Sequence, residues 1–548
     1  MKQPFTYCLM STVLACIIAG STSSCINKNQ LILTHPTQGN PYLPLWEHTP
    51  DGEPYVFDDP GMPGRQRVYI YGSHDTELTN YCGRDQVVWS APIDSLWNWR
   101  YDGVIFSVDK NRDGQQLNAD GKGDVLYAPD VCCVSAPDGT ITYYLYPNVQ
   151  ADGRSALIAK SRRPDGPFEV CNWSHEDANS VEGVFVSDPA VLVDDDGRVY
   201  GYWGFMQSMA GEYDTATMAT VKPGTKVIEN MIPSLKQDTV FRFFEASSIR
   251  KIKDKYIFIY SRWTNDGEFG LPNTNYTLAY AYSSHPLGPW TYGGTIIDGR
   301  GRDIDEQGDT IVTATPSANT HGSICEINGQ WYVFYHRQTG RSEFARQAMV
   351  SPITVNVEDG PDGKVFISEG EYNSEGFALN GLNPLERHSA GIACWYTGPK
   401  LWRKHGDDFY SGSYIEAGYG TDDKFKAPYD LKNNTNRVVN NNDGSIVGYK
   451  YFNFDAIKDR KDASILLQLV PEGIDGIIAI WADRPWASQG GKLLGTIVLT
   501  ADMPQTSTEL SASLPDLGTL QGKHAIFLTF SSPTKGKSLC SLEYLKFE

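Results

Sequence analysis

The sequence of 548 residues predicts an all-β protein, with a five-bladed β-propeller followed by a β-sandwich domain. Three observations support this fold class: a hairpin pattern recurs five times, the pattern of apolar and polar residues changes from about Leu385, and amphipathic helix patterns are nearly absent. Each hairpin has a polar residue that opens a short apolar run, then a turn, then a run rich in tyrosine. β-Branched and aromatic runs joined by turns such as Asp138-Gly139 are typical of antiparallel hairpins.

The five repeats share one frame. Their opening polar residues are Glu53, Asp130, Asp188, Glu245 and His321. The tyrosine-rich runs that follow are anchored at Tyr69, Tyr144, Tyr200, Tyr256 and Tyr332. These anchors are separated by roughly 55 to 75 residues, and a hairpin repeated at such a period indicates a propeller with one blade per repeat. In two repeats a further strand leads into a Gly-Pro-aromatic turn, at 159–168 and 281–290.

A propeller gives the five opening residues a common location. The innermost strand of each blade runs along the central channel, so residues that begin these strands converge at one end of the axis. Four of the five are carboxylates, and both their mutual repulsion and partial burial raise the pKa of at least one of them. Paired acid and base catalysis needs this arrangement, although any one of these residues taken alone is more simply a turn residue.

The last part of the chain has short alternating runs separated by polar loops, for example at 464–470 and 524–530. Strands at this spacing predict a β-sandwich. We therefore expect a signal peptide at 1–25, the propeller domain at 26–375 and the sandwich at 376–548.

Composition argues against some classes of partner. There are 66 Asp plus Glu against 47 Lys plus Arg, and the formal net charge of −19 disfavours binding to nucleic acid or anionic membranes. The aromatic content of 12% suits stacking on sugars, although filling of β-sheets explains it equally. The cysteines that follow the N-terminal region form no Cys-x-x-Cys pair, so no zinc site is predicted.

The N-terminus has the pattern of an export signal. Lys2 precedes a largely apolar run from Phe5 to Gly20, and small residues lead to Cys25. This predicts a lipoprotein with Cys25 lipidated; simple cleavage and secretion is the alternative, because Thr22 stands where an aliphatic residue is usual. No later run reaches 18 consecutive apolar residues. We expect export to the periplasm or surface of a Gram-negative bacterium, with membrane contact only through a lipid anchor.

Six short motifs stand out along the first part of the chain, at 69–75, 127–131, 187–190, 194–197, 244–248 and 321–323. Together they resemble glycoside hydrolase family 43, five-bladed enzymes that cleave arabinofuranosyl, xylosyl and related glycosides. They cover roughly residues 40 to 365. The C-terminal part resembles a family 6 carbohydrate-binding module, most clearly at 447–454 and 475–478.

The family 43 resemblance implies inverting hydrolysis by three carboxylates. It places the general acid at Glu245 and the residue that tunes the acid's pKa at Asp188. The general base falls on Glu53, where the family usually has Asp, so Asp51 is the nearest substitute. Asp130 is implied as a further channel carboxylate that helps to place substrate hydroxyls.

The resemblance also implies contacts around these carboxylates. His321 matches a histidine near a central calcium or sodium that is held largely by water, or else it is hydrogen-bonded in the channel without a metal. Arg346 is expected to contact the substrate ring, and His74 with Asp75 either to bind sugar hydroxyls or to cap a turn. No cofactor is required, and a structural calcium is possible.

The function expected from the sequence is removal of arabinofuranosyl or related units from plant-type oligo- and polysaccharides. A β-xylosidase or galactofuranosidase on the same frame is the alternative within this class. A non-catalytic glycan-binding surface lipoprotein is the alternative outside it. A lectin propeller is disfavoured, because the repeated aromatic residues lie within strands.

Overall fold

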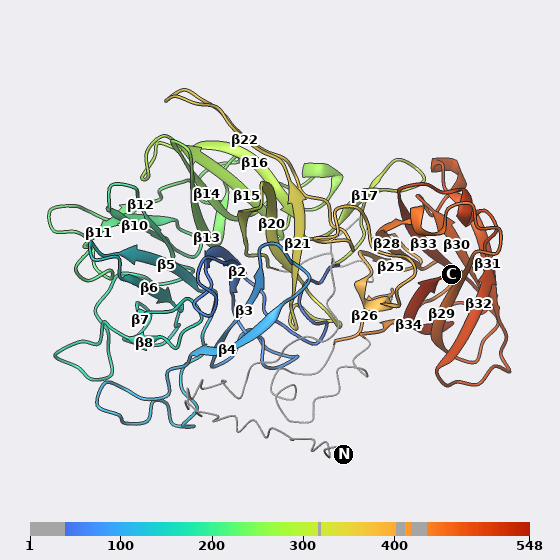
Figure 1. The fold of residues 1–548 in the computed structure, drawn as a ribbon, viewed down its shortest axis with the longest axis horizontal. Helices are drawn as coiled ribbons and strands as arrows, with labels where there is room; N and C mark the ends of the chain where they lie inside the picture. The colour runs from blue at the N-terminus through green and yellow to red at the C-terminus, as the bar shows by residue number, and fades with distance from the viewer. Residues whose placement is uncertain (1–38, 316–318, 402–411, 418–435) are drawn as a thin grey trace, which may run out of the picture.

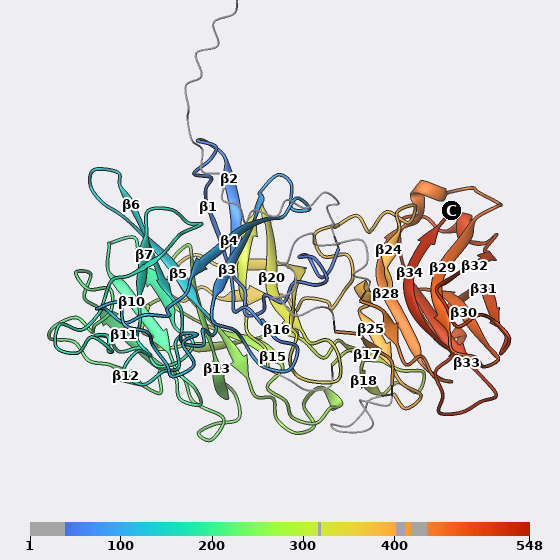
Figure 2. The same ribbon diagram turned by 90° about the horizontal axis from the view of Figure 1, so that it is seen from below.

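The computed structural model of the chain describes residues 39–315, 319–401, 412–417 and 436–548. Two β-rich bodies lie side by side, the larger formed by the earlier part of the chain and the smaller by the C-terminal part (Figure 1, Figure 2). The described residues contain no α-helix, only short 3-10 turns. The export signal and Cys25 predicted from the sequence lie outside these residues.

Five antiparallel sheets follow one another in the larger body, which confirms the predicted five-bladed propeller. Blade one contains β1 (Glu53–Asp58), β2 (Gln66–Tyr71), β3 (Gln86–Pro92) and β4 (Arg100–Phe106). Blade two contains β5 (Asp130–Ser135), β6 (Ile141–Tyr146), β7 (Ala159–Ser161) and β8 (Glu169–Val170). Blade three contains β9 (Ala190–Val193), β10 (Val199–Trp203), β11 (Met209–Tyr213) and β12 (Ile228–Glu229). Blade four contains β13 (Phe243–Ile252), β14 (Lys255–Arg262), β15 (Thr277–Ser283) and β16 (Thr291–Asp298), and blade five β19 (Ser323–Ile327), β20 (Gln330–Arg337) and β21 (Gln347–Ile353).

The N-terminal segment completes the three-stranded fifth blade. Tyr42 N–H donates to the carbonyl of Ala348 on β21 at 3.3 Å. The side chain of Asn40 donates to the carbonyl of Val350 at 2.6 Å and accepts from its N–H at 3.0 Å. The first described residues therefore lie along β21 in place of a fourth strand, which ties the two ends of the propeller together.

Cross-strand pairing shows which residues are equivalent between blades. The first strands pair with the tyrosine-rich second strands as Glu53↔Tyr71, Asp130↔Tyr146, Ala190↔Tyr202, Ser248↔Ile259 and Ser323↔Phe334. Asp188 and His321 thus lie two residues before the position that Glu53 and Asp130 occupy. A register shift in β13 leaves Glu245 opposite Ser261, at the same outer position. The residue of blade one at this outer position is Asp51, and that of blade two is Ala128.

Two sheets pack face to face in the smaller body, as expected for a sandwich. One has the order β26-β27-β34-β29-β32 with β24 beside β34, and the other β25-β28-β33-β30-β31. Its strands are β24 (His388–Ser389), β25 (Trp395–Thr397), β26 (Tyr414–Ile415), β27 (Val438–Val439), β28 (Ile446–Asn453), β29 (Ser464–Pro471), β30 (Gly476–Ala482), β31 (Lys492–Leu499), β32 (Thr508–Ser513), β33 (Lys523–Ser531) and β34 (Cys540–Phe547). Burial alternates along β29, as its apolar and polar residues predict.

Small elements complete the described chain. They are the hairpins β17 (Arg302–Ile304) with β18 (Thr310–Val312) and β22 (Val355–Val357) with β23 (Val365–Ile367), and the 3-10 turns η1 (Glu268–Gly270), η2 (Ala390–Ile392), η5 (Phe454–Ile457), η6 (Ala487–Gln489) and η7 (Leu517–Thr519). One buried apolar cluster runs from blades four and five into the sandwich, so the two bodies share a core. Within the described residues, no helix has the length and apolar character needed to cross a bilayer.

Candidate active site

A pocket of about 280 Å³ lies where the first strands of the blades begin. Five of its lining residues hold the outer position of their blades: Asp51, Ala128, Asp188, Glu245 and His321. The remaining lining residues are Tyr81, Cys82, Tyr127, Gln150, Ser187, Phe205, Asn319 and Arg346. The structure therefore brings three carboxylates, a histidine and an arginine to one small cavity.

Asp51 is the most heavily hydrogen-bonded of these carboxylates. Both of its oxygens accept from Nη1 of Arg346, at 3.0 and 3.1 Å, and the hydroxyl of Ser73 donates to Oδ2 at 2.5 Å. His336 Nδ1 lies 3.2 Å from Oδ1. Burial alone would raise the pKa of Asp51, but Arg346 and His336 outweigh it and hold the pKa well below the usual range. Asp51 is therefore ionised at neutral pH.

Glu245 has the opposite protonation preference. Burial raises its pKa well above the usual range, and the nearby charges of Asp188 and Asp51 raise it further, while Arg346 opposes the shift. Asp188 accepts from the Asn148 amide at 2.8 Å and from the backbone N–H of Ala246 at 3.0 Å. This second bond ties Asp188 to the residue that follows Glu245. Burial also raises the pKa of Asp188, against the opposing effect of His321.

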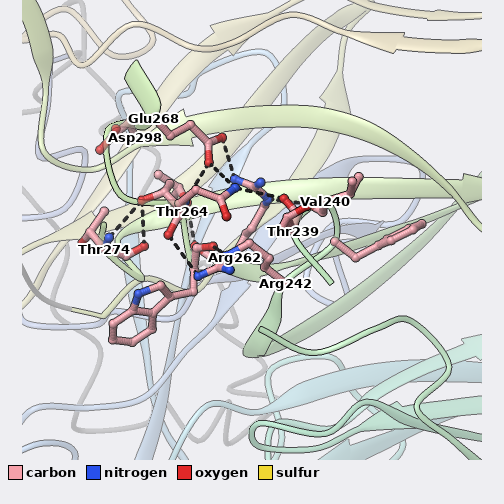
Figure 3. A network of polar contacts seen from close by, with 12 residues as sticks. Thr239, Val240, Arg242, Arg262, Thr264, Glu268, Thr274 and Asp298 are labelled. Carbon is pink, nitrogen blue, oxygen red and sulfur yellow. Dashed lines mark hydrogen bonds and ion pairs between the residues drawn. The ribbon is translucent and has the colours of Figure 1, made fainter. Parts of the chain in front are cut away.

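A polar network lies beside the start of β13, the strand that contains Glu245. Figure 3 shows this network around Arg242, Arg262 and Glu268. Arg262 donates from Nη1 to Glu268 at 2.8 Å and from Nε to the carbonyl of Val240 at 2.8 Å. Arg242 donates from Nε to the carbonyl of Trp263, the residue that follows β14, at 2.6 Å. The two guanidinium groups fix the chain immediately before Glu245, so the carboxylate is presented by an anchored strand end.

Three residues at or beside the pocket have left-handed backbone angles. Asp51 has φ 60°, Asp188 φ 42° and Ala246 φ 68°. Side-chain-bearing residues adopt these left-handed angles at a cost of about 1–3 kcal/mol each, and such residues cluster at functional sites. The strain indicates that the orientation of these carboxylates is fixed by their surroundings.

Glu53 lies one level deeper in the channel and is absent from the pocket lining. Its Oε2 accepts from Arg250 Nη2 at 2.7 Å and from the Ser248 hydroxyl at 3.2 Å. Arg250 also contacts Tyr55, donating to its hydroxyl at 3.2 Å and stacking on its ring at 4.5 Å. Glu53 is thus engaged in a buried ion pair, which is the usual condition for a buried charge.

Asp130 belongs to the same deeper level. It accepts from the Tyr55 hydroxyl at 2.6 Å and from the backbone N–H of Val191 at 2.6 Å. Burial and the charge of Glu53 raise its pKa to about 7, against the effect of Arg250. The sequence-based expectation that Asp130 places substrate hydroxyls is not supported by this position, because the side chain is buried below the pocket.

His74 and Asp75 also lie behind the pocket, each fully buried. Nδ1 of His74 is 2.5 Å from Asp85. Asp75 accepts from Arg346 Nε at 3.0 Å and Nη2 at 2.8 Å, so it holds the guanidinium that faces Asp51. Asp75 also accepts from the backbone N–H of Cys82 at 2.8 Å, as a residue that caps a turn does. Arg346 lines the pocket and His74 and Asp75 do not, so their contact with sugar hydroxyls stays a prediction.

His321 allows a test of the calcium suggested by the resemblance. Its Nε2 and Oε1 of Glu53 are buried 3.9 Å apart, and neither atom has a hydrogen-bond partner in the described part of the chain. No three His, Cys, Asp or Glu side chains within the described ranges are arranged to hold a metal directly. The residues present therefore fit water, or a cation surrounded by water, between these two atoms, and not a directly chelated ion.

Sequence reasoning missed several residues of the site. Arg250, which pairs with Glu53, was not singled out, whereas Arg346, which pairs with Asp51, was expected at the substrate. Tyr81 and Phe205 line the pocket from loops between strands, and so does Tyr127, which lies in the motif at 127–131 but was given no role. No period in the sequence marks these loop positions, because each follows a connection of different length.

Comparison with known proteins agrees with this geometry. The model of Glycosyl hydrolases family 43 matches residues 57–361. A xylosidase/arabinosidase of Thermoclostridium stercorarium is 33% identical over 541 residues, covering 92% of this chain and 98% of the relative. An arabinoxylan arabinofuranohydrolase of Bacillus subtilis (strain 168) is 25% identical over 573 residues, covering 100% of this chain and 99% of the relative.

Comparison of the fold with solved structures also gives matches. One is a glycoside hydrolase family 43 arabinoxylan arabinofuranohydrolase from Bacillus subtilis in complex with cellotetraose, with a TM-score of 0.43 and 19% identity, covering 93% of this chain and 97% of the other. The resemblance of the sandwich to a carbohydrate-binding module stays a prediction. The family match spans more than half of the chain, and the chain accordingly belongs to glycosyl hydrolase family 43 and is a glycosidase.

Proposed function

We propose that this glycosidase removes single arabinofuranosyl or xylosyl units from plant polysaccharides such as arabinoxylan, with inversion at the anomeric carbon. The observation that supports this most directly is the pair of opposite pKa shifts in one pocket, low at Asp51 and high at Glu245. Two carboxyl groups whose pKa values are driven apart are the usual acid and base of a glycosidase. Relatives named for xylosidase, arabinosidase and arabinofuranohydrolase activities support the choice of sugars.

Asp51 is the general base in this proposal, the alternative that the sequence left open beside Glu53. Asp51 is ionised, lines the pocket and holds the same outer position as Asp188 and Glu245. Glu53 lies below the pocket, in an ion pair with Arg250. A base must reach a water molecule on the open face of the sugar, and only Asp51 of the two faces the cavity.

Glu245 is the general acid, and burial together with the charge of Asp188 keeps it protonated. Hydrolysis then takes one step. Asp51 accepts a proton from a water molecule while the oxygen of that water bonds to the anomeric carbon, and Glu245 donates its proton to the departing glycosidic oxygen. Arg346 holds Asp51 in place while Asp75 holds Arg346. A cation held through water near His321 and Glu53 would supply positive charge below the sugar.

The size of the pocket supports exo action on single units. Its volume of about 280 Å³ is at the lower end for ligand pockets, which start at roughly 300 Å³. The exposed ring of Phe205 stacks edge-on with Phe244, next to Glu245. Because Glu245 protonates the leaving oxygen, this aromatic edge lies on the side of the remaining polysaccharide.

Hydrolysis of 4-nitrophenyl α-L-arabinofuranoside, 4-nitrophenyl β-D-xyloside and arabinoxylan tests the proposal, with Glu245→Gln as the control. We expect release of a monosaccharide from at least one substrate and proton NMR signals of the inverted anomer before mutarotation. No activity on these substrates, or product of retained configuration, would contradict the proposal.

An export signal and a lipid anchor at Cys25 remain part of the proposal for the cellular setting, which places the enzyme outside the inner membrane. Labelling with a radioactive fatty acid tests this, with Cys25→Ser as the control.

A further inference from the structure

The sandwich meets the propeller through the sheet that contains β25, β28 and β33. Ile311 on β18 of the propeller is fully buried in a cluster with Trp395 and Phe527 of that sheet. Trp481 and Trp486 pack against the same cluster. Figure 2 shows the hairpin β17–β18 lying beside β25 and β28. An aromatic sheet face of the kind that suits sugar stacking is therefore covered by the propeller.

Hydrogen bonds and ion pairs also join the propeller to the sandwich at this interface. Asp303 on β17 accepts from Lys450 Nζ at 3.0 Å and from Arg484 Nη1 at 2.9 Å. Tyr396 N–H donates to the carbonyl of Thr313 at 2.7 Å. Lys450 belongs to β28, the strand on which the resemblance to a carbohydrate-binding module is clearest. Lys450, one of the residues that suggested glycan binding, thus serves a contact between the two bodies.

A second contact reaches towards the pocket. Arg337, the last residue of β20, is fully buried and donates from Nη1 to the carbonyl of Ala393 in the sandwich at 2.8 Å. Just beyond it, Gly340 N–H donates to the carbonyl of Ile415 on β26 at 2.7 Å. The guanidinium of Arg341 stacks on the ring of Tyr414, also on β26, at 4.7 Å.

These residues begin the loop 338–346, which ends in the pocket. The Thr339 hydroxyl donates to the carbonyl of Ala345 at 2.8 Å, which closes the loop on itself. Phe344 packs edge-on against Tyr81 of the pocket wall at 4.7 Å. Arg346 follows directly and binds Asp51. The path from the sandwich to the carboxylate pocket is therefore one short, internally bonded loop.

We propose that the C-terminal sandwich is a positioning domain, which holds the loop 338–346 through β26 and so places Phe344 and Arg346 at the pocket. The proposal rests on the proposed function in one respect, because the pocket must be the active site for the positioning to affect catalysis. Tyr414 and Arg341 are positioning residues, since neither lines the pocket. Glycan binding through Tyr414 itself is the competing outcome.

Tyr414→Ala in the full-length protein separates the two roles. A positioning domain predicts that kcat/KM falls by the same factor on a small 4-nitrophenyl glycoside and on arabinoxylan, about 2- to 5-fold for loss of one exposed cation–π contact. A glycan-binding domain predicts a loss on arabinoxylan alone. Tyr414→Phe keeps the ring and should restore wild-type rates on both substrates.

A matched control exists within the sandwich. Arg387 stacks on the ring of Tyr544 at 4.1 Å, an Arg–Tyr pair outside the loop 338–346. Tyr544→Ala should leave kcat/KM on both substrates unchanged. A fall in kcat/KM for this variant would show that any loss of sandwich stability lowers activity.

Hydrogen–deuterium exchange gives a readout that needs no activity. In Tyr414→Ala the backbone amides of 338–346 should exchange faster than in wild type, while those of the central β28 keep their protection. Faster exchange in Tyr414→Ala, combined with no hydrolysis by the wild-type protein, would support the positioning domain but contradict the proposed function. Unchanged exchange together with unchanged rates on the small glycoside would overturn the positioning domain.

Discussion

Replacement of Asp51 by asparagine distinguishes the two candidate bases most sharply when it is compared with Glu53→Gln. The amide side chain introduced by Asp51→Asn would keep the shape of the carboxylate and one oxygen to accept from Arg346, and Asp75 would still hold that guanidinium through two hydrogen bonds. The pocket should therefore remain assembled, and KM should change little. What is lost is the proton acceptor for water.

The magnitude follows from the role. General base catalysis contributes about 10²–10⁴-fold, so kcat of Asp51→Asn should fall by that factor, equivalent to about 3–5 kcal/mol in the activation free energy. Glu53→Gln acts on a different property. It removes the charge that pairs with buried Arg250, and breaking such a pair costs about 3–5 kcal/mol of folding free energy. Its kcat should stay within about 10-fold of wild type, since proton transfer by Asp51 is untouched.

The assay measures kcat and KM for 4-nitrophenyl glycosides, together with the melting temperature of each variant. Sodium azide serves as a chemical probe, because an anionic nucleophile needs no base and can replace water at the anomeric carbon. Azide should restore 4-nitrophenol release by Asp51→Asn and yield a glycosyl azide, and should have no such effect on Glu53→Gln. The reasoning is refuted if Glu53→Gln loses more than about 100-fold at an unchanged melting temperature while Asp51→Asn stays active.

Three further predictions concern the acid, its neighbour and the deeper level of the channel. Glu245→Gln should lose about 10²–10⁴-fold on arabinoxylan but much less on a 2,4-dinitrophenyl glycoside, whose leaving group needs no proton; equal losses on both would exclude Glu245 as the acid. Asp188→Asn removes a negative charge that raises the pKa of Glu245, so that pKa falls and the alkaline limb of the kcat/KM profile should move to lower pH; a shift to higher pH would contradict the assigned role. Chelator-treated protein should gain melting temperature on addition of calcium, and His321→Ala should abolish the gain; no response of wild type would indicate that only water lies beside His321 and Glu53.

The hairpin repeat was sufficient to predict the propeller, because the tyrosine-rich runs form the largely buried second strands of all five blades. Those strands pack between neighbouring strands on both sides, so their apolar and aromatic pattern does not depend on the length of the loops. The level of each polar residue in the channel was harder to predict. It depends on where pairing starts across the hairpin, and turns of different length hide that register in the sequence.

Glu53 shows how this affected the site. It opens β1 in the structure as the sequence indicated, yet Asp188 and His321 lie two residues before β9 and β19. The five residues that look equivalent along the chain therefore occupy two levels. The deeper partner Arg250 and the buried positions of His74 and Asp75 follow from tertiary packing between blades, which no local pattern records.

The two levels explain why similar carboxylates take different protonation states. Each level contains one guanidinium: Arg250 pairs with Glu53 below, and Arg346 pairs with Asp51 above. Asp75 and Asp51 together hold the upper cation, Arg346, and Glu245 faces the negative charges of Asp51 and Asp188 without an ion pair of its own among the described residues. The acid and the base are thus distinguished by which carboxylate receives the single arginine. Moving that arginine, by substitution or by loosening the loop 338–346, should weaken the base, because Asp51 would lose the positive charge that holds its pKa low.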